Sequence, residues 1–147
     1  MAKYLLGHER MNTGRIGASK RELAKLKEFS GRQTGDDGRP LIDDARFRDK
    51  LTRVEVELIA LEITNLRFLD QMRRSGQPPG ADVSMLKIKG TEIQQALTEL
   101  MMQAADPGAQ REFTGLAKRY ANMRKTTIYA GSNEIQRNII SKMTLGL

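Results

Sequence analysis

The feature that most constrains the fold of this chain is a long stretch of helical periodicity in its first half. Between about Ile42 and Arg74, apolar residues recur at steps that keep near one face of a helix. That face carries Leu51, Val54, Leu58, Leu61, Leu66, Leu69 and Met72, and Val56, Ile59 and Ile63 widen it. We therefore expect a long helix that is buried on more than one side.

Two further helices are predicted after this one. The break Ser75-Gly76-Gln77-Pro78-Pro79-Gly80 cannot continue a helix or a strand. The stripe beyond it steps by three and four residues, as a bundle helix does: Val83, Leu86, Gly90, Ile93, Leu97, Leu100 and Ala104. Asp106-Pro107-Gly108 ends that helix, and a third is expected from about Gln110 to Lys125. Its apolar side carries Phe113, Leu116, Tyr120 and Met123.

The start of the chain completes an all-helical pattern. The segment from Tyr4 to Phe29 mixes apolar residues with the small residues Gly14, Gly17 and Ala18, which permit close approach to a neighbour or a ligand. A loop is expected from Gly31 to Pro40, followed by a helix capped by Asp43 or Asp44. Aromatic residues make up only 5% and Trp is absent. We predict an all-α antiparallel four-helix bundle with a short C-terminal helix after Gly131, forming one domain over residues 1–147.

Composition excludes several classes of chemistry. The chain has no Cys and a single His, His8, so thiolate and histidine-rich metal sites are excluded and no metal is expected. With 25 Lys and Arg against 18 Asp and Glu, the formal charge of +7 favours an anionic partner such as a nucleotide, CoA, nucleic acid or acidic lipid. Basic and acidic residues are interspersed along every helix, which disfavours nucleic acid. No membrane span or signal peptide is evident, and we expect a cytoplasmic protein with no membrane partner.

The most informative stretch runs from Thr126 to Ile140 and reads Thr-Thr-Ile-Tyr-Ala-Gly-Ser-Asn-Glu-Ile-Gln-Arg-Asn-Ile-Ile. A turn opens abruptly onto an amphipathic helix, and Ser132 or Asn133 supplies its cap. The amino end of that helix presents N–H groups with a partial positive charge, which suits an anionic or carbonyl-rich ligand. An ordinary capped helix–turn–helix explains the same residues without a ligand.

The residues from Ile128 to Ile140 resemble the C-terminal signature of the acyl-CoA dehydrogenases, a Tyr-x-Gly-Thr/Ser-x-Glu/Gln-Ile-Gln-Arg pattern. The closing Ser-Lys-Met-Thr-Leu-Gly-Leu and the opening Leu-Leu-Gly-His-Glu-Arg at residues 5–10 resemble the two ends of that family's C-terminal helical domain. The resemblance implies that the family's N-terminal helical and middle β domains precede residue 1, and that Met1 starts either a fragment prepared for expression or a truncated chain. It also implies FAD as cofactor, an acyl-CoA substrate that is oxidised to a trans-2-enoyl-CoA, and electron-transfer flavoprotein as electron acceptor.

The resemblance also implies roles for individual residues. In the family, the catalytic carboxylate lies either directly before the Gly of the signature, where this chain has Ala130, or on the first helix of the domain before an Arg, where it has Glu9. Glu9 is therefore the candidate base, and a water-excluded Glu is a stronger base than a solvated one. Its neighbour Arg10 is a candidate substrate-binding residue, as is Gly131. Candidate cofactor-binding residues are Ser132, Asn133 and Glu134. His8 is expected to be structural or merely adjacent to Glu9.

Three departures from the family pattern keep a second function open. Thr34 to Pro40 replaces an Arg-x-x-Phe-Gly-x-Pro segment that helps bind FAD, and a Gln expected near Asp44-Ala45 is replaced. A Gln-x-x-Gly-Gly-x-Gly motif is missing between Pro107 and Arg124. The alternative to catalysis is a non-catalytic assembly domain, or one subunit of a heteromeric acyl-CoA dehydrogenase. In either case we expect a homo- or hetero-oligomer formed through the helical bundle.

Overall fold

The described part of the chain is helical throughout. A computed structural model describes residues 14–35, 37–77, 80–81, 83–105 and 110–146. The main helices are α2 (Ile16–Arg32), α3 (Ala45–Ser75), α4 (Val83–Ala104), α5 (Gln110–Met123) and α6 (Asn133–Ile140). Three short helical segments are η1 (Leu41–Asp43), η2 (Arg124–Thr127) and η3 (Ser141–Leu145). Within the described ranges there is no strand, only an isolated bridge between Thr34 and Pro40.

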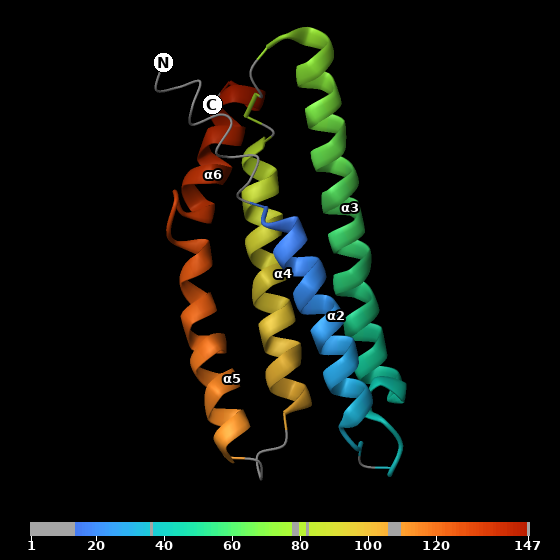
Figure 1. Ribbon diagram of the computed structural model, residues 1–147. Coiled ribbons are helices and arrows are strands. Elements are labelled where there is room, and N and C mark those ends of the chain that lie inside the picture. The colour runs from blue at the N-terminus through green and yellow to red at the C-terminus, as the bar shows by residue number, and fades with distance from the viewer. Residues whose placement is uncertain (1–13, 36, 78–79, 82, 106–109, 147) are drawn as a thin grey trace.

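Helices α2 to α5 form an antiparallel four-helix bundle, as the periodicity predicted. α4 lies at its centre and packs against α2, α3, α5 and α6. α5, η2 and α6 follow one another along α4, so that the last part of the chain runs beside a single helix (Figure 1). Both the bundle and the short C-terminal helix after Gly131 are confirmed.

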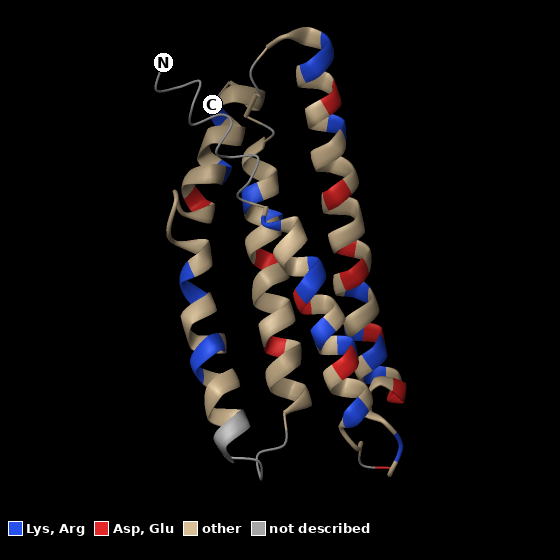
Figure 2. Ribbon diagram, in the orientation of Figure 1, with Lys and Arg blue, Asp and Glu red and all other residues tan. Residues whose placement is uncertain are grey.

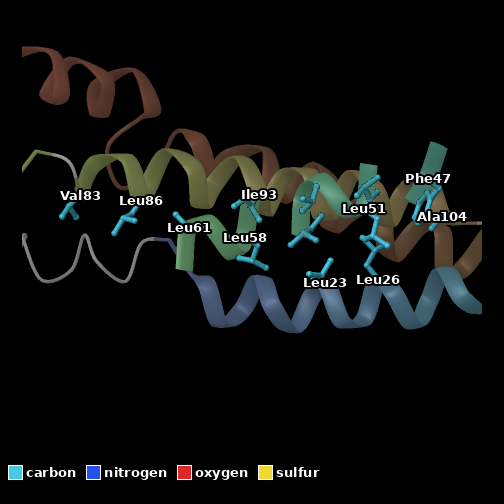
Figure 3. Packing of buried hydrophobic residues seen from close by; sticks show 13 residues of the cluster. Leu23, Leu26, Phe47, Leu51, Leu58, Leu61, Val83, Leu86, Ile93 and Ala104 are labelled. Atoms are coloured by element: carbon cyan, nitrogen blue, oxygen red, sulfur yellow. The ribbon is translucent and has the colours of Figure 1, made fainter. Parts of the chain in front are cut away.

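The core lies where the inner faces of α2, α3 and α4 meet (Figure 3). The whole predicted stripe of α4 is buried: Val83, Leu86, Gly90, Ile93, Leu97, Leu100 and Ala104. Leu23 and Leu26 of α2 and Phe47 of α3 pack against it. Full burial of one such aliphatic or aromatic side chain is worth about 1.5–3 kcal/mol, so this cluster is the main source of the bundle's stability.

One prediction about α3 is wrong for the single chain. Its inner face is buried through Phe47, Leu51, Val54, Leu58 and Leu61. The residues expected to widen that face, together with Leu66 and Leu69, are instead exposed: Val56, Ile59, Ile63, Leu66 and Leu69. The physical reason is that α3 lies at the edge of the bundle and packs against α2 and α4 on one side only (Figure 1).

The helix boundaries follow the predicted caps with small shifts. Asp44 caps α3, because its Oδ1 accepts from the backbone N of Phe47 at 2.8 Å. Gly76 ends α3 in the left-handed conformation with φ 65°. The loop after α2 begins at Gln33 rather than at Gly31. The helix expected to reach Lys125 ends at Met123 and tightens into η2.

Charges of both signs alternate along α2 and α3 (Figure 2). Lys20 pairs with Glu62 at 2.7 Å and Lys27 with Glu55 at 2.6 Å, which ties these two helices together. Because basic side chains are matched by acidic ones on the same surface, the positive net charge is not gathered into a recognition face on these two helices.

Candidate functional site

The signature stretch forms a turn that is held against α4 on both sides. On its amino-terminal side, the Gln95 amide of α4 donates to the backbone oxygen of Arg124 at 3.1 Å. The Arg124 guanidinium donates in return to the Gln95 carbonyl at 2.9 Å and lies 4.3 Å from the Tyr120 ring centre. Thr126 is buried, and its hydroxyl donates to the Met123 carbonyl at 2.8 Å. These contacts fix η2 on α4.

A buried polar cluster holds the other side of the turn. The Lys87 ammonium of α4 donates to Oδ1 of Asn133 at 2.8 Å, and the Asn133 amide donates to the Thr91 hydroxyl at 3.2 Å. Only 3% of Lys87 and 4% of Asn133 is exposed. Burial lowers the pKa of Lys87, and the nearby Glu134 carboxylate partly offsets this. The first residue of α6 is therefore anchored by a buried cation.

Between these anchors the turn projects into solvent. Ile128 and Tyr129 are exposed, and two consecutive residues take positive φ, Ala130 at 56° and Gly131 at 83°. A Cβ built on Gly131 would lie 2.6 Å from Nε2 of Gln136. Gln136 is buried beneath the turn, and its Oε1 has no hydrogen-bond partner. Glycine is thus favoured at position 131 by the backbone conformation, and a Cβ there would also displace the end of the Gln136 side chain.

Ser132 and Glu134 shape the amino end of α6. The Ser132 hydroxyl accepts from the backbone N of Ile135 at 3.4 Å, which makes Ser132 the cap. The pKa of Glu134 is lowered, first by its own backbone N–H and the Ser132 hydroxyl, and further by Arg137 and Lys87. The Glu134 carboxylate is exposed and charged at neutral pH, so it is available to a partner outside this chain.

The start of α2 is brought against α4 by a contact between two glycines. A Cβ built on Gly90 would lie only 2.6 Å from Cα and 2.7 Å from O of Gly14. Arg15 follows in a left-handed conformation with φ 46°, after which α2 begins. The approach predicted from the small residue Gly14 is therefore present. Glu9, Arg10 and His8 lie outside the described residues.

A pocket of about 250 Å³ lies between α2, α4 and α5. Its lining combines apolar side chains such as Leu97 and Leu116 with the buried Ser19, whose hydroxyl has no hydrogen-bond partner. Arg119 of α5 and Glu22 of α2 also line it and form an ion pair at 2.5 Å. Whole-ligand sites usually enclose about 300–1,000 Å³, so this pocket suits part of a ligand rather than a complete acyl-CoA.

The site residues fit a flavin better than they fit a metal. Across the described ranges, no group of three or more His, Asp or Glu side chains could hold a metal ion. The exposed turn, in contrast, offers the polar groups of Ser132 and Glu134 beside a glycine with no Cβ, and the unpartnered Gln136 oxygen lies beneath it. Both polar atoms of the Asn133 side chain are already engaged by hydrogen bonds inside the chain. Among the described helices, none combines the length and the hydropathy of a membrane-spanning segment.

Three functional features escaped the sequence analysis. In the sequence, Lys87 looks like one more cation on an amphipathic helix. Gln136 and Gly90 sit within regular helical patterns, and their contacts depend on elements far along the chain. A Lys within an otherwise apolar helix face was the one signal that could have been used.

The family comparison and the curated relatives agree on one family. The family described as "Acyl-CoA dehydrogenase, C-terminal domain" matches residues 1–145. Among curated proteins, acyl-CoA dehydrogenase IpdE1 of Mycobacterium tuberculosis is 34% identical over 131 residues, which is 86% of this chain and 32% of IpdE1. The chain therefore spans about a third of the length of that relative.

Solved structures share the fold. A glutaryl-coenzyme A dehydrogenase in complex with glutaryl-CoA superposes with a TM-score of 0.79 and 20% identity, covering 96% of this chain and 36% of that one. A chain of the ChsE4–ChsE5 complex from Mycobacterium tuberculosis gives 0.69 and 24% identity, covering 90% of this chain and 36% of that one. At these identities the likeness concerns the fold alone. The family match over residues 1–145 and the helical bundle lead to one conclusion: this chain belongs to the acyl-CoA dehydrogenase family and corresponds to its C-terminal domain.

Proposed function

We propose that this chain acts as the C-terminal domain of an FAD-dependent enzyme that oxidises an acyl-CoA thioester to a trans-2-enoyl-CoA. The observation that carries the proposal is the turn around Gly131, which is anchored to α4 on both sides and exposed between the anchors. A rigid, exposed backbone segment suits positioning of a substrate carbonyl and a cofactor, because it requires no ordering when the ligand binds. In this proposal, N-terminal α and middle β domains complete the binding sites for FAD and acyl-CoA. The proposal also includes a cytoplasmic location.

The chemistry assigned to this chain is proton removal. When bound, FAD would accept the hydride that leaves the β-carbon of the acyl group. Glu9 takes the α-proton, and its basicity depends on exclusion of water. Arg10 places a cation beside the phosphate-rich substrate. Gly131 lets backbone approach the thioester, where N–H groups stabilise negative charge as it develops on the carbonyl oxygen.

The cofactor contacts proposed for this chain lie at the start of α6. Ser132 and Glu134 present a hydroxyl and a carboxylate, and Asn133 contributes its backbone because Lys87 and Thr91 hold its side chain. The loop from Thr34 to Pro40 corresponds to the family's flavin-binding segment. Its two ends are joined by the isolated bridge between Thr34 and Pro40. In it the Arg39 guanidinium pairs with Asp37 at 2.6 Å. Among the described residues, we therefore assign the proposed flavin contacts to the Gly131 turn rather than to that loop.

The test is anaerobic reduction of the flavin by acyl-CoA in the complete protein that contains this chain. Bleaching of the flavin absorbance by a saturating acyl-CoA, with formation of the enoyl-CoA, is the expected result. A protein that binds FAD but is never bleached by any acyl-CoA of a chain-length series would refute the dehydrogenase proposal.

A non-catalytic assembly role is the second candidate, and the exposed apolar residues of α3 favour it. In that case the chain would associate with a second subunit, identical or related, and would not itself supply the catalytic base. We propose electron-transfer flavoprotein as the electron acceptor only if this chain has the catalytic role. The two candidates differ in one result, since only a catalytic chain loses proton abstraction when Glu9 is replaced.

A further inference from the structure

Lys87 is a buried cation whose hydrogen-bond partner is neutral. It lies on the side of α4 that packs against α6, and only 3% of it is exposed. Its ammonium donates to Oδ1 of Asn133 at 2.8 Å, and an amide oxygen carries no net charge. Glu92, the next acidic residue along α4, pairs instead with Lys89. Among the described residues, Glu134 is the carboxylate whose charge acts on Lys87.

The charge of Lys87 is not needed to anchor Asn133. The Thr91 hydroxyl accepts from the Asn133 amide at 3.2 Å and lies 3.3 Å from its Oδ1, so a neutral group is already in place to hold the same side chain. A buried cation without a counter-ion is costly, whereas an apolar side chain of similar length would fill this space without that cost. Ionisable groups held in such surroundings concentrate at functional sites.

The charge lies next to the first residue of α6. The free N–H groups at that end of the helix carry a partial positive charge, to which the Lys87 ammonium adds a full one. Because the ammonium is 2.8 Å from the Asn133 side chain, any group that touches the Asn133 backbone lies within about 10 Å of it. Water and salt screen a buried charge much less than an exposed one. The charge of Lys87 is therefore felt at the Gly131 turn.

We infer that Lys87 is a positioning residue whose charge favours the reduced state of a flavin held at the Gly131 turn, an inference that rests on the proposed function. In that function the Asn133 backbone contacts FAD. A neutral flavin ring that accepts a hydride acquires one negative charge, and a nearby buried cation stabilises that charge. Lys87 acts through Asn133 and through its charge, and proton abstraction remains with Glu9.

The size of the effect follows from burial. Two unit charges about 10 Å apart, at the effective dielectric constant of about 20 that applies in proteins, change an equilibrium constant by about tenfold. Lys87 should therefore raise the affinity for reduced flavin relative to oxidised flavin by about tenfold, which is about 30 mV for a two-electron couple. Glu134 has the opposite sign and is exposed, so its effect should be smaller, about two- to threefold.

The test is the midpoint potential of the flavin in the complete protein that contains this chain, measured by reductive titration against a reference dye. Lys87→Gln removes the charge but keeps an N–H donor for Asn133, whereas Lys87→Met removes both. Each variant should lower the potential by about 30 mV, the tenfold effect. If the Lys87→Met protein does not hold FAD, Lys87→Gln alone decides.

Lys89→Met is the matched control, because it removes the same charge from an exposed position on the same helix. It should leave the ratio of the two flavin affinities within about 1.5-fold of the wild type, or the potential within about 5 mV. A shift as large as that of the Lys87 variants would overturn the special role of the buried cation.

Glu134→Gln checks the sign of the effect. It removes a negative charge from the same end of α6 and should raise the potential by about 10–15 mV, the two- to threefold effect. A mere disturbance of the turn has no reason to change sign with the charge that is removed. A lowered potential in Glu134→Gln would therefore overturn the electrostatic role of Lys87.

The remaining outcomes separate Lys87 from the proposed function. An unchanged potential in the Lys87 variants, with FAD still bound, would overturn the role of Lys87 and leave the dehydrogenase proposal standing. A shift in Lys87→Met without one in Lys87→Gln would assign the effect to the hydrogen bond and overturn the role of the charge. The expected shifts in a protein that no acyl-CoA reduces would support Lys87 and refute the dehydrogenase proposal. A complete protein that binds no FAD would overturn both.

Discussion

Replacing Gly90 by Ala should destabilise the bundle, because this glycine lets the start of α2 touch α4. A Cβ at position 90 would lie 2.6 Å from Cα, 2.7 Å from O and 2.9 Å from C of Gly14. All three atoms belong to the backbone, so no side chain can rotate away. Ordinary contact begins near 3.4 Å, and the Gly14 backbone would have to retreat by about 0.8 Å.

The magnitude follows from two opposing effects. Forcing an extra methyl group into a packed interface costs about 1–3 kcal/mol. Ala is a better helix former than Gly by about 1 kcal/mol, which offsets part of that cost. We expect a net loss of about 1–2 kcal/mol in the free energy of unfolding, or a fall in Tm of about 2–8 °C for a chain of this size.

The assay is urea and thermal unfolding followed by circular dichroism, with Gly115→Ala as the matched control. Gly115 lies in α5 with no atom within 4 Å of a built Cβ, so this variant should gain about 0.5–1 kcal/mol. The two substitutions are chemically identical and differ only in the space around them. Equal stabilisation by both would refute the close contact between Gly14 and Gly90.

Three further predictions concern the Gly131 turn. Gly131→Ala should lower the free energy of unfolding by about 1–2 kcal/mol, because Ala is strained at a φ of 83°, while the end of the Gln136 side chain can move away from the new Cβ; urea unfolding without such a loss would contradict this. Asn133→Leu removes the partner of the buried Lys87 ammonium and should cost about 2–3 kcal/mol at neutral pH. Because the folded pKa of Lys87 lies below its ordinary 10.5 and loss of Asn133 lowers it further, this cost should shrink as the pH rises toward the folded pKa of the wild type and be lost above it; a cost independent of alkaline pH would argue against a buried charge. The lowered pKa of Glu134 means that its stabilisation is complete above 4.5 and is lost as the pH falls through the folded pKa. In the Glu134→Gln variant, the free energy of unfolding should therefore depend less on pH between 4.5 and the lowered folded pKa of Glu134. An unchanged pH dependence would show that this carboxylate does not contribute to stability.

Sequence periodicity was sufficient for the helices because each apolar stripe reports directly which side of a helix is buried. The stripe of α4 could be predicted residue by residue, since its partners surround it on several sides. The same reasoning failed for Val56, Ile59 and Ile63. Periodicity shows that a face is apolar, but it does not show whether that face is covered within one chain or by a second one.

The candidate site could be located from sequence but not built from it. The signature motif predicted a capped helix after Gly131, and Ser132 is that cap. What anchors the turn depends on contacts between residues far apart in the sequence, such as Gln95 with Arg124, 29 positions away, and Lys87 with Asn133, 46 positions away. Such pairs become visible only when α4 and α6 are placed side by side, because a single Lys or Asn has many possible partners in the sequence alone.

The most direct test of the account asks whether this chain supplies the base. In the complete protein, Glu9→Gln should leave FAD and acyl-CoA binding nearly intact, because the amide preserves shape and most polar contacts. Glu28→Gln on the exposed side of α2 is the matched control and should behave like the wild type.

The measurement is the anaerobic rate of flavin bleaching at saturating acyl-CoA. Loss of a general base typically lowers such a rate by about 10²- to 10⁴-fold, and we predict a decrease of that size for Glu9→Gln. Wild-type bleaching in the Glu9→Gln protein, with FAD and acyl-CoA still bound, would contradict the assignment of proton abstraction to this chain.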